Sequence, residues 1–263
     1  MKIGFLGCGN MGGALAVSVR SACPAADILL CDTNEEKAAA LAEKLHAGVC
    51  TLAELVRRSD YVFLGVKPQV LPDVLGTVAG SLPPSPPVFV SMAAGVPLSS
   101  LAEKLGQVPL IRIMPNTPVS VGKGSILYVP ANTVTEEQEK DFCGMMQKAG
   151  ELHKLPERLI DAGSALSGCG PAYVFLFLEA LADGGVACGL SRADARRLAA
   201  ETVLGSASLA LSSGSSPAEL KDAVCSPAGS TIAGVAALEE GGFRAATMRA
   251  VTEAYRRTLE LGK

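Results

Sequence analysis

Three glycines near the start of the chain have the spacing of a loop that binds nucleotide phosphates. Gly7, Gly9 and Gly12 form a G-x-G-x-x-G pattern, with an apolar run before them and an alanine-rich run after them. The pattern predicts a buried strand, a tight turn and the first turn of a helix, whose free amides would hold a pyrophosphate. A plain glycine-rich turn is the alternative, but the flanking strand and helix favour the nucleotide site. The predicted contacts in this stretch are Gly7, Gly9, Asn10, Met11 and Gly12.

A carboxylate ends the second apolar run, Asp27–Asp32, where a dinucleotide fold places the acceptor for the adenosine ribose. We therefore expect Asp32, Thr33 and Asn34 at the adenosine end of a bound NADH or NADPH. Beside Asp32, the 2′-phosphate of NADPH would be repelled by about 1 kcal/mol in water and by about 4 kcal/mol at an effective dielectric of 20. No arginine in the range 33–37 offsets this repulsion, although Thr33 and Asn34 could donate to a phosphate and Asp32 could rotate away. The sequence predicts that NADH is used at least as well as NADPH.

Lys67 follows a fully apolar strand, Asp60–Val66, and precedes Pro68. Strands of this kind are covered on both faces, and the ligands of open α/β sheets bind at the carboxyl ends of the strands. We expect Val66, Lys67 and Pro68 to border the cofactor, with Lys67 facing the ligand and Pro68 starting the next helix. A solvated surface lysine is the alternative.

Two more loops stand at the carboxyl ends of predicted strands. Ala93 follows the strand Val88–Met92, while Asn116 and Thr117 follow the strand Leu110–Met114 and lie between two prolines. The rigid proline loop carries side chains that can donate to a nicotinamide carboxamide. We therefore expect Ala93, Asn116 and Thr117 to contact the cofactor, although a structural turn explains the two prolines almost as well.

A loop in the C-terminal half resembles the opening stretch, because small residues and a glycine again precede a predicted helix. Ser226–Thr231 combines small hydroxyl residues and a glycine ahead of a predicted helix, Ile232–Glu240. Amides and hydroxyls presented at the start of a helix bind anions. Because the dinucleotide is already placed on the N-terminal half, a small carboxylate substrate is the expected ligand. An ordinary Ser or Thr cap after a turn is the alternative.

The order of elements predicts an α/β fold in two domains. Strands and helices alternate through residues 1–157, which predicts a Rossmann-type doubly wound sheet that binds the dinucleotide. Helix follows helix through residues 158–263, which predicts an all-helical domain for substrate binding and dimerisation. These alanine- and leucine-rich helices have more apolar surface than they can hide alone, so we expect an obligate homodimer formed by residues beyond about 160.

The composition argues against several classes of partner. A net charge of −3 with 19% charged residues lacks the basic excess that nucleic acid or anionic membranes require. The best apolar run, Val174–Ala182, is interrupted by Glu179 and is shorter than the ~20 residues of a membrane span, so we expect a cytoplasmic protein. The 8 cysteines form no C-x-x-C pair and the 2 histidines stand near no ligand cluster, so no metal site is expected.

Five motifs, in order along nearly the whole chain, resemble those of pyrroline-5-carboxylate reductase. They are the glycine-rich start, the V-K-P sequence at 66–68, the M-P-N-T-P loop at 114–118, the S-G-C-G-P-A-Y sequence at 167–173 and the stretch 224–232. The resemblance implies a Rossmann domain joined to a helical dimerisation domain, with interlocked dimers that can assemble into decamers. It implies reduction of 1-pyrroline-5-carboxylate, a cyclic imino acid, to L-proline by NAD(P)H, the last step of proline biosynthesis.

The resemblance also implies roles for individual residues, in an active site between the Rossmann edge and the loop. Thr231 would hydrogen-bond near the ring nitrogen and relay a proton, while Lys67 would lend positive charge beside the nicotinamide. Ser226 and the amides of Gly229 and Ser230 would hold the substrate carboxylate. A protonated ring imine is already electrophilic, so orientation does much of the work and neither a metal nor a strong acid is required.

Two positions depart from the family pattern. Ala228 stands where the family usually has glycine, a change that the loop accommodates if the position does not require positive φ. The family usually favours NADPH, whereas Asp32 is the acid expected for an unphosphorylated ribose.

Two other functions fit the same arrangement of elements. A β-hydroxyacid dehydrogenase would use a helix-borne lysine, here Lys221, as acid and base, and would oxidise a 3-hydroxy acid. A dinucleotide-sensing regulator would bind the cofactor without consuming it when the imine is supplied. The intact Ser226–Thr231 loop argues against the regulator.

Overall fold

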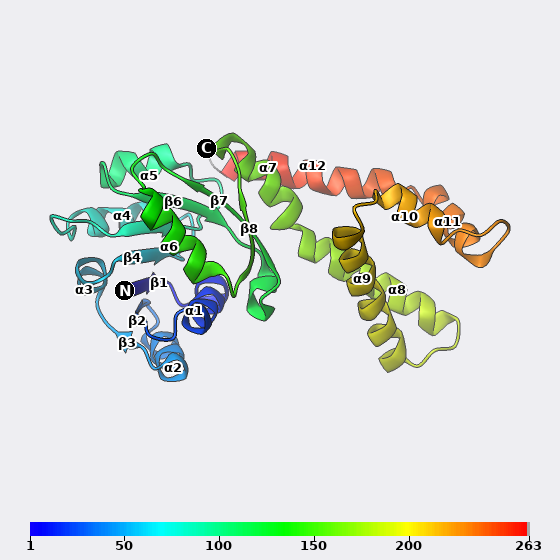
Figure 1. The fold of residues 1–263 in the computed structure, drawn as a ribbon, viewed down its shortest axis with the longest axis horizontal. Helices are drawn as coiled ribbons and strands as arrows, with labels where there is room; N and C mark the ends of the chain where they lie inside the picture. Colours follow the sequence, from blue (N-terminus) through cyan, green and yellow to red (C-terminus); the bar gives the residue numbers. More distant parts are fainter. Residues whose placement is uncertain (262–263) are drawn as a thin grey trace. The chain divides into compact units, whose positions relative to one another are not determined.

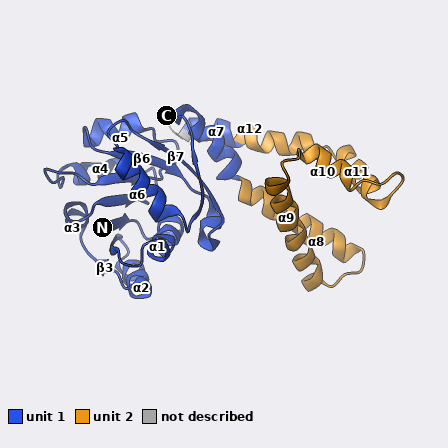
Figure 2. Cartoon of the chain, viewed as in Figure 1, with its two compact units in different colours: residues 1–169, 254–263 blue, residues 170–253 orange. Residues whose placement is uncertain are grey.

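The structure, a computed structural model, describes residues 1–261 and divides into two compact units (Figure 1, Figure 2). The first unit comprises residues 1–169 together with the end of the last helix from Ala254, and the second comprises residues 170–253. The first is an α/β unit and the second is entirely helical, so the predicted fold class is confirmed.

An eight-stranded sheet forms the centre of the first unit, with the strand order β3-β2-β1-β4-β5-β6-β7-β8. All neighbouring strands are parallel except β6 and β7, which are antiparallel. Leu6, the last residue of β1, pairs with Cys31 on one side and Leu64 on the other, so three strands end level where the chain order reverses. Ligands bind at such a switch point. The strands are β1 (Lys2–Leu6), β2 (Asp27–Cys31), β3 (Gly48–Val49), β4 (Tyr61–Leu64), β5 (Val88–Ser91), β6 (Leu110–Met114), β7 (Gly124–Pro130) and β8 (Gly150–Lys154).

Helices cover both faces of this sheet, as expected for strands that are buried on both sides. Alternate residues of β4 enter different clusters, since Phe63 packs with α1, α2 and α6 whereas Leu64 packs with α3, α4 and α5. Local caps fix where several helices begin; Thr51 and Glu54, for example, form a reciprocal capping box at α3. The helices are α1 (Asn10–Ala22), α2 (Glu35–Leu45), α3 (Leu52–Arg58), α4 (Leu71–Ala79), α5 (Leu98–Leu105), η1 (Thr117–Val121, a 3-10 helix), α6 (Glu136–Met146) and α7 (Glu157–Ser167).

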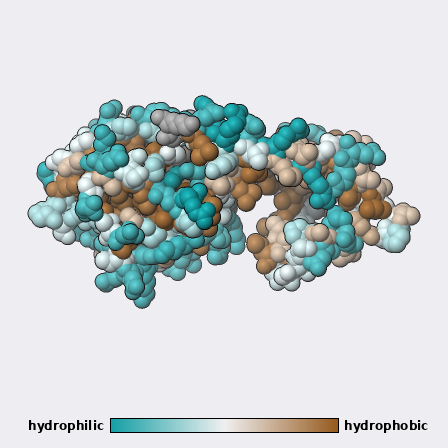
Figure 3. Space-filling model, turned by 90° about the horizontal axis from the view of Figure 1, so that it is seen from above, coloured by the Kyte–Doolittle hydropathy of each residue, from teal (hydrophilic) through white to brown (hydrophobic). Residues whose placement is uncertain are grey.

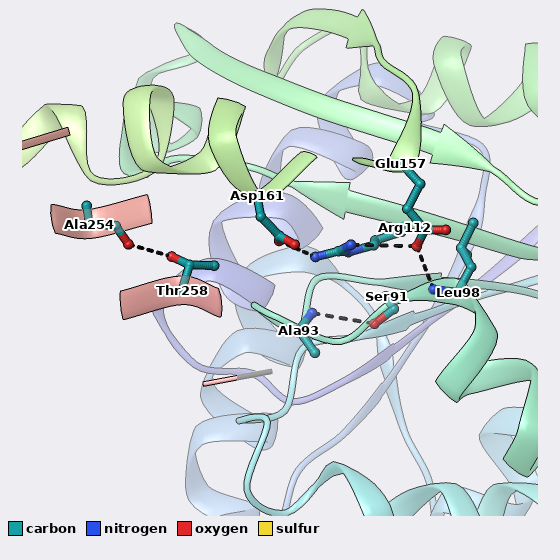
Figure 4. A network of polar contacts seen from close by, with 8 residues as sticks. All are labelled: Ser91, Ala93, Leu98, Arg112, Glu157, Asp161, Ala254 and Thr258. Atoms are coloured by element: carbon teal, nitrogen blue, oxygen red, sulfur yellow. Dashed lines mark hydrogen bonds and ion pairs between the residues drawn. The ribbon is translucent and has the colours of Figure 1, made fainter. Parts of the chain in front are cut away.

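The first helix beyond the predicted domain boundary, α7, belongs to the sheet unit. Arg112 of β6 is only 1% exposed, and its guanidinium lies 2.5 Å from Asp161 and 3.6 Å from Glu157, both on α7 (Figure 4). Glu157 also accepts a hydrogen bond of 2.6 Å from the Leu98 amide at the start of α5. The compact units of the structure divide after Cys169, because the ion pairs of the buried Arg112 hold α7 on the sheet, whereas the predicted domain boundary lies at 157/158.

The second unit buries little apolar surface of its own. It contains α8 (Gly170–Ala187), α9 (Arg192–Ser213), α10 (Pro217–Ala223), α11 (Ser230–Glu240) and most of α12 (Phe243–Leu261). Its buried apolar cluster, within the described part of the chain, consists of Ala182, Ala195 and Ala199. Phe175 and Leu176 are 61% and 67% exposed, and hydrophobic surface is visible on this unit in Figure 3. Helices with uncovered apolar faces require a partner.

One helical segment, Glu157–Ala187, is long and apolar enough to cross a membrane by length and composition alone, since its 31 residues contain an 18-residue window with a mean hydropathy of 1.5. The expectation that no run approaches this length was therefore too strict. The segment consists of two helices, α7 and α8, separated by Gly168 and Cys169 in a turn. Ile160 of α7 is fully buried in the sheet unit, in a cluster with Met114 and Leu127.

Candidate functional site

Each of the three glycines of the opening loop has a different steric reason to lack a side chain. Gly7 has φ +98°, and a Cβ there would lie 2.6 Å from the carbonyl oxygen of Gly65. A Cβ on Gly12 would lie 2.1 Å from the carbonyl oxygen of Gly7, so this glycine allows α1 to pack against the loop. A Cβ on Gly9 would meet no atom within 4 Å, which leaves the space in front of it open. Gly9 is the N-cap of α1 and no side chain caps the helix, so the first amides of α1 are free for an anion.

A cavity of about 600 Å³ lies at this loop and reaches the ends of β1, β2 and β4. It brings together most of the residues predicted for the dinucleotide. It is lined by Leu6, Gly7, Gly9, Asn10, Met11, Gly12, Cys31, Asp32, Thr33, Leu52, Gly65, Val66, Lys67, Val70 and Val74. Sequence reasoning missed the apolar walls from Leu52, Val70 and Val74, because an apolar residue that lines a cavity carries no motif.

Asp32 lines the cavity but is already hydrogen-bonded to the backbone. Its Oδ2 accepts from the amide of Cys8 at 2.6 Å, and its Oδ1 accepts from the amide of Asn34 at 2.8 Å. Burial, and secondarily the charge of Asp32, raises the pKa of the Cys8 thiol to about 11. Asn34 does not line the cavity; its side chain caps α2 by accepting from the Lys37 amide at 2.9 Å. The structure thus gives Asn34 a capping role, and its contact with the cofactor stays a prediction.

Lys67 is exposed and lines the cavity together with Val66, whereas Pro68 does not. The carbonyl of Lys67 accepts from the amides of Val70 and Leu71, and this turn places the start of α4 at Leu71. The prediction that Pro68 starts the helix was wrong, because the chain makes a turn after the proline before becoming helical.

The M-P-N-T-P loop does not border this cavity, and neither does Ala93, which is buried. Asn116 is 8% exposed; its Oδ1 accepts from the Ser125 amide at 2.9 Å and its Nδ2 donates to the Ser167 carbonyl at 3.0 Å. The carboxamide of Asn116 therefore ties β7 and α7 together, and its contact with nicotinamide stays a prediction. Thr117 begins η1 and is exposed.

The Ser226–Thr231 loop in the second unit ends in another uncapped helix. α11 begins at Ser230, earlier than the predicted Ile232, and its N-cap is Gly229 with no side chain bound to the first turn. The Gly229 amide donates to the Ser226 carbonyl at 3.1 Å, which closes the turn. Ser226, Ser230 and Thr231 are exposed, so their hydroxyls and the first amides of α11 can receive a carboxylate.

Ala228 in this loop has φ +52°. The position therefore does require a positive φ, so alanine replaces the family's glycine at the cost of backbone strain. A left-handed conformation costs an alanine roughly 1 kcal/mol or more, because its Cβ approaches the following carbonyl.

The lysine required by the rival dehydrogenase reading is poorly placed. Lys221 is half-buried on the short helix α10 and forms an ion pair with its neighbour Asp222. The hydrogen bond from Asp222 raises the pKa of Lys221 above its ordinary value, which disfavours a role as a base.

Comparisons with known proteins agree along the whole chain. Residues 157–261 match the family described as pyrroline-5-carboxylate reductase dimerisation, and residues 2–95 match the family described as NADP oxidoreductase, coenzyme F420-dependent. The pyrroline-5-carboxylate reductase of Methanosarcina acetivorans is 42% identical, covering 100% of this chain and 98% of the relative. That of Escherichia coli is 40% identical over the same shares of both chains.

Solved structures give the same answer. The crystal structure of Plasmodium falciparum pyrroline carboxylate reductase with NADP bound is 31% identical, has a TM-score of 0.91, and matches 100% of this chain and 98% of its own. The Streptococcus pyogenes enzyme has a TM-score of 0.90 at 32% identity, covering 99% and 98%. Full-length identity at this level confirms the resemblance carried by the five motifs and the predicted class of oxidoreductase. The chain belongs to the pyrroline-5-carboxylate reductase family.

Proposed function

We propose that this chain reduces 1-pyrroline-5-carboxylate to L-proline by hydride transfer from NADH or NADPH, as the last step of proline biosynthesis. The observation that carries the proposal is a pair of uncapped helix starts, one in each unit. The start of α1 opens into a dinucleotide-sized cavity, and the start of α11 carries exposed hydroxyls. The two sites suit a pyrophosphate and a small carboxylate, the two anionic groups of this reaction.

The substrate side of the chemistry is assigned to the loop before α11. Ser226 and the amides of Gly229 and Ser230 bind the carboxylate, and the Thr231 hydroxyl hydrogen-bonds at the ring nitrogen. The reduced nicotinamide supplies a hydride to the C=N carbon of the protonated imine. The nitrogen becomes an amine and takes up a proton through Thr231, so the step needs orientation and one proton relay. Lys67 adds positive charge at the cavity on the cofactor side.

The adenosine end of the cavity favours NADH at least as much as NADPH. The 2′-phosphate would lie beside the carboxylate of Asp32, and Glu35 and Glu36 add negative charge in the first turn of α2. No arginine stands in the range 33–37 to offset these charges. The repulsion of about 1 to 4 kcal/mol corresponds to roughly fivefold to several hundredfold in affinity.

The assembly proposed is a homodimer formed by the helices of the second unit, with decamers as a higher assembly. The exposed apolar residues of α8 and the match of residues 157–261 to a dimerisation family support it. The enzyme acts in the cytoplasm on a small molecule, without nucleic acid or membrane as a partner; the net charge of −3 supports this reading.

Purified protein supplied with racemic 1-pyrroline-5-carboxylate tests the function. Consumption of NADH or NADPH with formation of L-proline is expected. Oxidation of a 3-hydroxy acid instead would favour the β-hydroxyacid dehydrogenase, and cofactor binding without consumption would favour the regulator. Steady-state kinetics with both cofactors test the proposal that NADH is used at least as well as NADPH. A tenfold preference of the wild type for NADPH would contradict it. Asp32→Ser is expected to shift the preference toward NADPH.

A further inference from the structure

The phosphate-binding loop is hydrogen-bonded to the end of β2 and to the residue that follows it. The amide of Gly7 donates to the Cys31 carbonyl at 2.8 Å, and the next amide, that of Cys8, donates to Asp32 Oδ2 at 2.6 Å. Gly7 sits between the strand and the loop with φ +98°. These two bonds fix the direction in which the loop leaves the strand, one through the backbone and one through a side chain.

Asp32 is held as firmly as the loop. Its second oxygen accepts from the Asn34 amide at 2.8 Å, and the Asn34 side chain accepts from the Lys37 amide at 2.9 Å at the start of α2. Rotation of the carboxylate would break both of its backbone bonds, and hydrogen bonds to an ionised group are stronger than those between neutral groups. Asp32 also lines the cavity, and each of its oxygens keeps a lone pair beyond the bond to the backbone.

We propose that Asp32 is a positioning residue for the phosphate-binding loop in addition to its contact with the ribose. Its carboxylate couples the adenosine end of the cavity to the pyrophosphate end through the Cys8 amide. Without it the loop samples conformations in which the first amides of α1 no longer converge on the phosphate. The apparent affinity for the dinucleotide is then the intrinsic affinity multiplied by the fraction of molecules whose loop is in the binding conformation. The proposal rests on the proposed function only in taking the cavity as the dinucleotide site.

A ligand that lacks the adenosine ribose separates the two roles of Asp32. Reduced nicotinamide mononucleotide carries the nicotinamide and one phosphate but has no adenosine, so a residue that acts on the adenosine ribose alone cannot affect its binding. The chain contains no tryptophan, so nicotinamide fluorescence reports binding without overlap from that residue. The dissociation constants of this mononucleotide and of NADH are measured for wild type, Asp32→Asn and a control.

Asp60→Asn is the matched control. Asp60 Oδ2 also accepts from a backbone amide of β1, that of Lys2 at 2.7 Å, but it lies at the other end of the strand and away from the cavity. We expect Asp32→Asn to raise the dissociation constants of both ligands by at least about fivefold. The control is expected to change neither.

Three results would overturn the proposal. The first is an unchanged mononucleotide constant in Asp32→Asn with weaker NADH binding, which would confine Asp32 to the ribose. The second is an equal loss in Asp60→Asn, which would indicate general destabilisation. The third needs no variant: rapid hydrogen exchange of the Cys8 amide in the wild-type protein would show that the bond to Asp32 does not persist. Because all readouts are binding or exchange, an inactive enzyme would contradict the proposed function and leave these outcomes readable.

Discussion

Gly12 packs so closely on Gly7 that a Cβ on the first would lie 2.1 Å from the carbonyl oxygen of the second, while a Cβ on Gly9 would meet nothing within 4 Å. The two glycines therefore serve different purposes within one motif. Gly12 is required by the fold, and Gly9 keeps space for the ligand.

This difference predicts opposite outcomes for the same substitution. Gly9→Ala should raise the dissociation constant for NADH about tenfold, because the methyl group occupies the pyrophosphate space, with little change in the free energy of unfolding. Gly12→Ala should lower the free energy of unfolding by roughly 1–3 kcal/mol through overpacking. Titration calorimetry and denaturant unfolding measure the two effects. Unchanged binding in Gly9→Ala would show that the loop is not the phosphate site.

The buried guanidinium of Arg112 predicts a large loss of stability when its nearest partner is removed. Asp161→Ala should lower the free energy of unfolding by about 3 kcal/mol, because a charge that is 1% exposed loses its nearest partner. The control is Glu260→Ala, which removes the exposed pairs with Arg256 and Arg257 and should cost no more than about 1 kcal/mol. Equal losses in urea unfolding would contradict the account of how α7 is held.

Left-handed strain at Ala228 predicts that glycine is better tolerated there than elsewhere in the same unit. Ala228→Gly relieves roughly 1 kcal/mol of strain, partly offset by the greater freedom of glycine in the unfolded chain, so stability should rise or stay unchanged. The same substitution at Ala236, inside α11, should cost roughly 0.5–1 kcal/mol. Thermal unfolding compares the pair, and destabilisation by Ala228→Gly as large as by Ala236→Gly would remove the strain argument.

The exposed apolar face of α8 predicts that the protein is not a monomer. Light scattering at micromolar concentration should give at least twice the chain mass of 26.9 kDa. Leu176→Glu should shift the mass toward the monomer, since a charge would enter the interface, whereas Val49→Glu on the first unit should not. A monomer mass for the wild type would contradict the proposed assembly.

Local patterns allowed most of the fold to be predicted, and nine of the residues expected at the cofactor line one cavity. The glycine spacing, the acid after β2 and the alternation of strands with helices are properties of short segments, and the structure places them as expected. The structural role of Asn116 was not predicted, because its partners, Ser125 and Ser167, are brought to it by tertiary packing. The attachment of α7 was missed for the same reason, since nothing in an apolar strand indicates that Arg112 pairs with a helix 49 residues later.

Some backbone conformations could not be predicted from the sequence either. The left-handed φ of Ala228 is dictated by the turn that closes before α11, and an alanine gives no local sign of it. The early start of α11 is related, because Ser230 and Thr231 are small polar residues that read as loop but form the first helical turn.

The central claim, that this chain reduces a cyclic imine with the Thr231 hydroxyl at the ring nitrogen, is tested most directly by the turnover of Thr231→Ala. We predict that 1-pyrroline-5-carboxylate reduction falls on the order of 100-fold, while Thr231→Ser keeps most of the activity and the dissociation constant for NADH is unchanged in both. Wild-type turnover in Thr231→Ala would contradict the account.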